Sequence, residues 1–117
     1  MRDVIFEAES LPAETYWSSS SPGLNGPHVL YDQRTVHAID ITHGGGSGTI
    51  TITPYTSISG DTWVSNGTVL DGFLVTDGPD GDGKTAIPLS LIPGDLIKFK
   101  IVIGVATTVT SMSFVQK

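Results

Sequence analysis

The second half of the chain alternates apolar and polar residues with a period of two. Residues 49–56 read TITITPYT, and residues 96–103 read LIKFKIVI. A period of two sends successive side chains to opposite faces of a strand, so that one set lies in a core and the other faces water. In the second run the isoleucines and Phe99 form the core set, whereas Lys98 and Lys100 share the outward face and keep it soluble. Both runs predict antiparallel strands.

Turn-forming residues separate the apolar runs at short intervals. A Gly-rich stretch at 44–48 leads into the first run, DGPDGDGK follows at 77–84, and PGD at 93–95 precedes the second run. Gly supplies positive φ and Asp bonds its own backbone, so these stretches favour turns. About seven or eight strands at this spacing predict an all-β fold over residues 31–117, an antiparallel β-sandwich of jelly-roll-like type.

Residues 1–30 lack this alternation, because three prolines and the serine run at 18–21 interrupt it. We therefore predict an extended N-terminal arm with at most a short strand, followed by the sandwich domain at 31–117. The arm holds Phe6, Tyr16 and Trp17. Large aromatic side chains in an irregular segment need an apolar surface to pack on, either on their own domain or on a neighbouring subunit.

Composition and charge narrow the classes of function. At 117 residues the chain suits one domain, and it has no cysteine, which excludes disulfides, thiol catalysis and thiolate metal sites. The net charge of −6 disfavours nucleic acid and anionic membranes as partners. The apolar stretch at 97–106 is broken by lysines and is shorter than the ~20 residues of a membrane span. The first ten residues show no export signal, so we expect a protein that is made and used without crossing a membrane by itself.

The acidic loop at 77–84 admits two interpretations. Asp77, Asp80 and Asp82 supply carboxylate oxygens of the kind that bind Ca²⁺. An EF-hand-like loop would also need a bidentate Glu, and Lys84 follows instead. Asp-Gly pairs also form plain turns without any ligand. The sequence predicts a turn, with a calcium site as the alternative and no other cofactor.

No catalytic motif is visible in the sequence. None of the serines lies in a G-x-S-x-G context, and the three histidines are not spaced as a helical metal pair. We therefore predict that the protein is not an enzyme. A sugar-binding module is an alternative, because exposed aromatic rings stack on sugar rings. Its candidate residues are Tyr16, Trp17, Tyr55 and Trp63.

Residues 36–114 contain a distinctive order of elements. A strand at 39–41 is followed by the Gly/Ser loop, a TITI strand, a turn from Ser57 through Gly60 and Asp61 to Trp63, and a closing hairpin that ends in a Ser-Phe strand at 110–115. This order resembles small virion proteins of tailed bacteriophages, over about two-thirds of the chain.

The resemblance implies a non-enzymatic structural protein. Similar proteins are capsid decoration, or cement, proteins, which are made in the host cytoplasm, lie on the capsid exterior of the virion and are often trimers. It therefore implies a homotrimer whose partners are the major capsid protein or other virion proteins, with the arm residues Phe6, Tyr16 and Trp17 making the partner contact. A tail or fibre component is the alternative within the virion.

Overall fold

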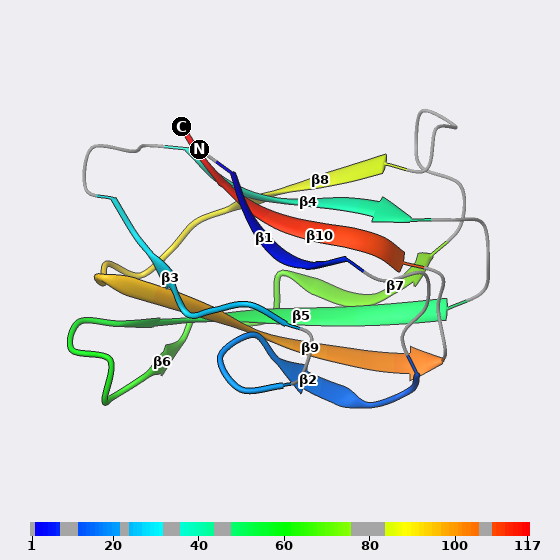
Figure 1. The fold of residues 1–117 in the computed structure, drawn as a ribbon, viewed down its shortest axis with the longest axis horizontal. Coiled ribbons are helices and arrows are strands. Elements are labelled where there is room, and N and C mark those ends of the chain that lie inside the picture. Colours follow the sequence, from blue (N-terminus) through cyan, green and yellow to red (C-terminus); the bar gives the residue numbers. More distant parts are fainter. Residues whose placement is uncertain are drawn as a thin grey trace.

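The structure, a computed structural model, consists of two antiparallel β-sheets packed face to face (Figure 1). It describes residues 2–7, 12–21, 24–31, 36–43, 48–75, 84–105 and 109–117. The predicted all-β sandwich is confirmed. Within those ranges no helix is long and apolar enough to cross a membrane.

One sheet has four strands in the order β1-β10-β4-β8, and the other has six. The six-stranded sheet has the order β2-β9-β5-β6, with β3 also paired to β9 and β7 also paired to β5. The strands are β1 (Arg2–Glu7), β2 (Thr15–Trp17), β3 (His28–Val29), β4 (His37–His43), β5 (Gly48–Ser57), β6 (Val64–Ser65), β7 (Leu70–Val75), β8 (Lys84–Leu89), β9 (Leu96–Val105) and β10 (Val109–Gln116).

The two alternating runs of the sequence form β5 and β9, which pair along most of their length. On β9 the residues Ile97, Phe99 and Ile101 are fully buried, and Lys98 and Lys100 lie on the other side, half-buried. The period of two thus separates core from surface, as a half-buried strand requires. The opposite edge of β9 pairs with β2 and β3.

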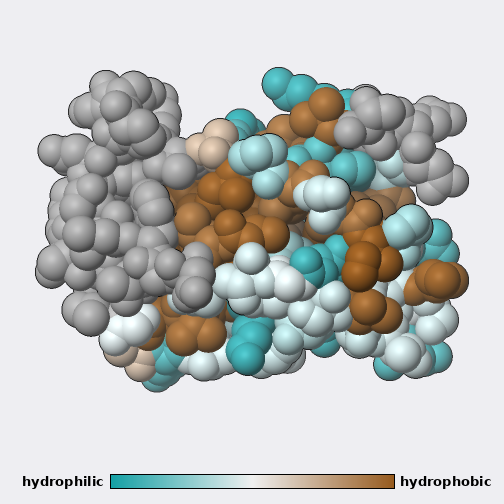
Figure 2. All heavy atoms as spheres, turned by 180° about the vertical axis from the view of Figure 1, so that it is seen from behind, coloured by the Kyte–Doolittle hydropathy of each residue, from teal (hydrophilic) through white to brown (hydrophobic). Residues whose placement is uncertain are grey.

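The core lies between the sheets and consists mainly of isoleucine and phenylalanine. Figure 2 shows hydrophobic side chains along the middle of one side of the molecule, at the height where the two sheets meet. Burying these branched and aromatic side chains is the dominant favourable term in folding. The core residues are Ile5, Phe6, Tyr16, Ile39, Ile41, Ile50, Ile52, Ile87, Ile97, Phe99, Ile101, Ile103, Met112 and Phe114.

The N-terminal segment is part of the sandwich in this structure, which differs from the separate arm expected for residues 1–30. β1 forms the edge of the four-stranded sheet on β10, and the chain ends lie side by side because Arg2 pairs with Val115 (Figure 1). β2 and β3 both add to β9. These two strands have three and two residues, too few for a period of two to show in the sequence.

Candidate functional site

The structure separates the three aromatic residues singled out in the N-terminal segment. Phe6 on β1 is buried in the core. Tyr16 on β2 is also buried, and its hydroxyl donates a hydrogen bond to the carbonyl oxygen of Pro12 at 3.1 Å. Trp17 follows directly and therefore projects to the opposite face, where it is half-buried. Of the three, only Trp17 lies on the surface of the domain.

The predicted calcium ligands Asp77, Asp80 and Asp82 lie outside the residues that the structure describes. In the described ranges, no three His, Asp or Glu residues lie close enough together to hold a metal ion. The calcium site therefore stays a prediction from the sequence.

Five side chains meet on the outer face of the six-stranded sheet. Trp17 is the strand partner of Lys100, and Tyr55 is the strand partner of Lys98. Direct partners in an antiparallel sheet project to the same face, and so do the two lysines, which are two residues apart on β9. Trp63 joins them through its contact with Lys98. We call Trp17, Tyr55, Trp63, Lys98 and Lys100 the aromatic-lysine face.

The two lysines lie against the aromatic rings. The Nζ atom of Lys98 is 5.0 Å from the ring centroid of Trp17 and 4.5 Å from that of Trp63. The Nζ atom of Lys100 is 5.7 Å from the ring centroid of Trp17. The rings of Trp17 and Tyr55 are tilted by 58°, with centroids 5.2 Å apart. A cation over a ring gains about 0.5–1 kcal/mol at an exposed site, so these contacts hold the five side chains together.

In the part of the chain that the structure describes, the recorded contacts of the Lys98 and Lys100 ammonium groups are with aromatic rings. The described residues form one salt bridge, which joins Arg2 and Asp40 of the four-stranded sheet and does not involve either lysine. An aromatic ring attracts a cation through its quadrupole but carries no net charge, so it does not neutralise a lysine. The aromatic-lysine face is therefore a positive spot on a protein whose net charge is −6.

Hydroxyl groups border the aromatic-lysine face. Thr53 is the strand partner of Lys100, and its Oγ1 atom lies 3.1 Å from the Oγ1 atom of Thr68. Ser65 is the strand partner of Tyr55 on the other side of β5. The rings and cations therefore lie beside groups that both donate and accept hydrogen bonds.

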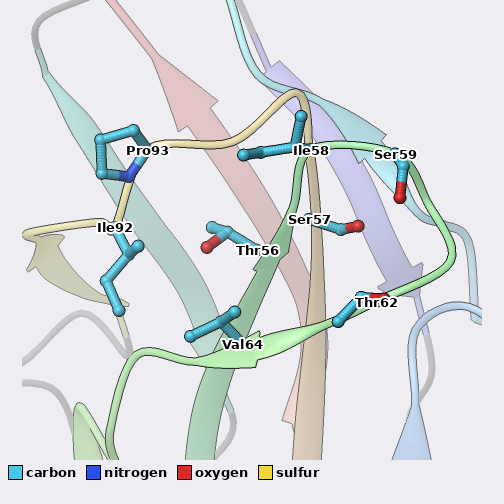
Figure 3. A pocket seen from close by; sticks show the side chains of 8 residues that line it. All are labelled: Thr56, Ser57, Ile58, Ser59, Thr62, Val64, Ile92 and Pro93. Atoms are coloured by element: carbon cyan, nitrogen blue, oxygen red, sulfur yellow. The ribbon is translucent and has the colours of Figure 1, made fainter.

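A second surface feature is an apolar hollow of about 220 Å³ where β5 ends (Figure 3). Ile58, Val64 and Ile92 around it expose 76%, 48% and 43% of their surface. Figure 3 shows Ile92 and Pro93 on one side of the hollow and the β5 residues beside them. No residue that lines it carries a charge. The lining residues are Thr56, Ser57, Ile58, Ser59, Thr62, Val64, Ile92 and Pro93.

Hydrogen bonds fix the frame of this hollow. The Oδ1 atom of Asn66 accepts a bond from the backbone N–H of Ile92 at 2.6 Å, and its Nδ2 atom donates to Oγ1 of Thr56 at 3.2 Å. Gly94 lies so close to Ser57 that a Cβ atom there would be 3.0 Å from the carbonyl oxygen of Ser57. The loop at 90–95 is thus held against β5 by polar contacts and close backbone approach.

The sequence reasoning found the components of the aromatic-lysine face but not their assembly. It named Trp17, Tyr55 and Trp63 as sugar-binding candidates and placed the two lysines on an outward strand face. The missing step was the pairing of β2 with β9, which brings Trp17 to Lys100. The hollow was missed, because its walls come from segments far apart in the sequence.

Comparisons with known proteins supply no family for the chain. No protein-family model, curated protein or solved structure matches it. The fold and its surfaces define an all-β sandwich with an apolar hollow and an aromatic-lysine face. The resemblance to phage virion proteins stays a prediction.

Proposed function

We propose that this chain is a non-enzymatic structural protein of a phage virion, a decoration protein that attaches to the capsid exterior through the apolar hollow. The exposure of Ile58, Val64 and Ile92 around one uncharged, concave surface carries the proposal. Contiguous exposed aliphatic surface of this kind is typical of protein–protein contacts. The occupant we propose is an apolar side chain that projects from the major capsid protein.

The hollow suits a weak contact that is repeated many times. Removing apolar area from water contributes roughly 25 cal/mol per Å², so a hollow for one or two side chains gives a modest affinity. A shell presents the same site at each lattice position, and a homotrimer, which the resemblance implies, engages several sites at once. Linked weak contacts then add through their effective concentration and brace the shell.

Co-sedimentation with shells of the phage that encodes the chain tests this proposal. Ile58→Ser removes the most exposed aliphatic side chain of the hollow, on which the fold does not depend because 76% of Ile58 is exposed. Val36→Ser is the matched control, since Val36 is 53% exposed and does not line the hollow. We expect roughly tenfold weaker shell binding for Ile58→Ser, which corresponds to about 1.4 kcal/mol, and unchanged binding for Val36→Ser.

Each other outcome changes the proposal in a defined way. Equal binding by Ile58→Ser and the unchanged protein would exclude the hollow as the contact. Electron microscopy that shows the protein on the tail alone would make it a tail or fibre component. Failure of the unchanged protein to bind any part of the particle would reject the virion role, and a monomeric mass in solution would reject the trimer.

A further inference from the structure

The aromatic-lysine face contains none of the residues that line the hollow, and its chemistry indicates a different ligand. We propose that this face binds acidic carbohydrate, that is, a saccharide chain whose rings carry carboxylate groups. The proposal goes beyond shell attachment and does not depend on it. On a decoration protein, such a face would tether the particle to an acidic polysaccharide.

The lysines select for negative charge. Among the described residues the ammonium groups of Lys98 and Lys100 contact aromatic rings, which accept no N–H hydrogen bond as strong as that of a carboxylate, so an anion is the better partner for their N–H donors. Hydrogen bonds between an ammonium and a carboxylate are roughly twice as strong as neutral ones. The net charge of −6 opposes the approach of an acidic chain at long range, so short-range contacts with the two lysines supply the attraction.

The rings and hydroxyls favour a saccharide over an acidic peptide. A sugar ring presents C–H groups on its flat faces and hydroxyl groups at its edge. The rings of Trp17, Tyr55 and Trp63 are half-buried, and the ring surface that the lysines leave uncovered offers apolar area for those faces. Thr53 and Ser65 beside them exchange hydrogen bonds with sugar hydroxyls. A peptide carboxylate would use the lysines but leave most of this arrangement unused.

The geometry suits an extended chain rather than a chain end. The face is the outer side of a sheet, and the Nζ atom of Lys98 lies within 5.0 Å of both the Trp17 and the Trp63 ring centroids. Two ring platforms therefore flank one cation. A carboxylate binds at Lys98 between the two tryptophans, neighbouring sugar rings contact the ring surface that the lysines leave uncovered, and Lys100 binds a further carboxylate.

Tryptophan fluorescence reports binding at this face directly, because both tryptophans of the chain belong to it. The probe is a short oligogalacturonate at low salt, and its comparison is a neutral glucose oligomer of the same length. We expect a saturable change with the acidic probe, a much weaker one with the neutral probe, and a loss of affinity as salt screens the lysines.

Two variants divide the face into its parts. Lys98→Gln removes the central charge, and we expect roughly tenfold weaker binding of oligogalacturonate with no loss for the neutral oligomer. Trp63→Ala removes one of the two tryptophan rings, and we expect weaker binding of both the acidic and the neutral oligomer. The fluorescence of Trp17 still reports binding in this variant. The matched control is Lys117→Gln, which changes the net charge equally but lies exposed at the C-terminus. Circular dichroism verifies that each variant folds.

Three results would overturn the proposal: no fluorescence change with oligogalacturonate at low salt, equal affinity for the neutral oligomer, or an equal effect of Lys117→Gln and Lys98→Gln. Binding of poly-glutamate as tightly as oligogalacturonate would assign the face to acidic peptide instead. Ile58→Ser lies outside the face, so it leaves the sugar titration unchanged. Failure of shell attachment and failure of sugar binding are thereby distinguished.

Discussion

The two parts of the N-terminal segment are held to the sandwich in different ways. β1 lies on β10 and inserts Ile5 and Phe6 into the core, where both are fully buried. The described residues at 12–21 and 24–31 pair with β9, bury Tyr16 in the core, and in addition bury polar side chains, among them Ser18. The first part is held mainly by apolar burial, whereas the second combines apolar burial with side-chain hydrogen bonds of defined direction.

The polar contacts of residues 18 and 29–31 are paired and short. The backbone N–H of Phe99 donates to Oγ of Ser18 at 2.8 Å, and the N–H of Ser18 donates to the Phe99 carbonyl at 3.0 Å. Gln116 on β10 makes two further bonds. Its Oε1 atom accepts a hydrogen bond from the backbone N–H of Tyr31 at 3.1 Å, and its Nε2 atom donates one to the carbonyl oxygen of Val29 at 2.8 Å. These bonds fix the position of the stretch along β9.

The difference between the two parts has a functional meaning. Apolar burial is non-directional, whereas hydrogen bonds weaken steeply when their geometry changes. The stretch with the directional contacts is the one that carries Trp17, directly before Ser18. Polar docking thus places Trp17 in register with Lys100 on the aromatic-lysine face, while β1 serves the core.

The largest expected effect is on the apolar part. Phe6→Ala removes a fully buried ring, and we expect a loss of about 3–5 kcal/mol in the free energy of unfolding, measured by urea denaturation. Val4→Ala on the same strand is the control, because Val4 is partly exposed and its loss should cost about 0.5 kcal/mol or less. Similar losses for the two variants would show that β1 is not docked through Phe6.

The same contrast shows how much of the fold was predictable. β5 and β9 have ten residues each, long enough for alternation and flanking turns to identify them. β2 and β3 exist because β9 offers unpaired backbone groups along its edge, and nothing local in a serine- and proline-rich stretch indicates that partner. Strand order depends on such distant pairing, which a single sequence does not contain.

The candidate sites follow the same rule. Alternation placed Lys98 and Lys100 on the outward face, and the structure has them there. The contact of Trp17 with them depends on the register of β2, so the sequence did not reveal it. An isoleucine beside a turn, Ile58, is the one indication of the hollow in the sequence. It is a weak one, because Ile92, which also lines the hollow, comes close to Ile58 only in the folded chain.

A smaller loss is expected in the polar part. Gln116→Met keeps the side-chain volume but leaves the Tyr31 N–H and the Val29 carbonyl without this partner. Leaving a buried polar group unpaired costs about 1–3 kcal/mol, and urea denaturation measures the loss. An unchanged free energy of unfolding would show that water takes over the two hydrogen bonds of Gln116. The position of residues 29–31 would then not depend on these bonds.

The smallest expected effect is pH-dependent and concerns His28 on β3. The His28 side chain is buried, and its ring centroid lies 6.2 Å from that of Phe114. Its Nε2 atom has no hydrogen-bond partner among the residues that the structure describes. Burial lowers the pKa of His28 below its ordinary value of 6.5, although Asp3 and the backbone of Asn25 partly oppose this effect. The folded protein therefore resists protonation of a group that the unfolded chain protonates freely.

The sign of the pH effect follows from proton binding. As the pH falls through about 6.5, the unfolded chain takes up a proton at His28 that the folded chain excludes, so stability decreases until the lower folded pKa is passed. Unfolding in urea at about pH 7.5 and about pH 5.5 measures this decrease, and His28→Phe should show less of it because the titrating group is gone. The other two histidines are common to both proteins and cancel in the comparison. An equal loss of stability in the unchanged protein and in His28→Phe would mean that the folded protein protonates His28 as readily as the unfolded chain does. The segment around β3 would then change its structure more easily than the hydrogen bonds of Ser18 and Gln116 indicate.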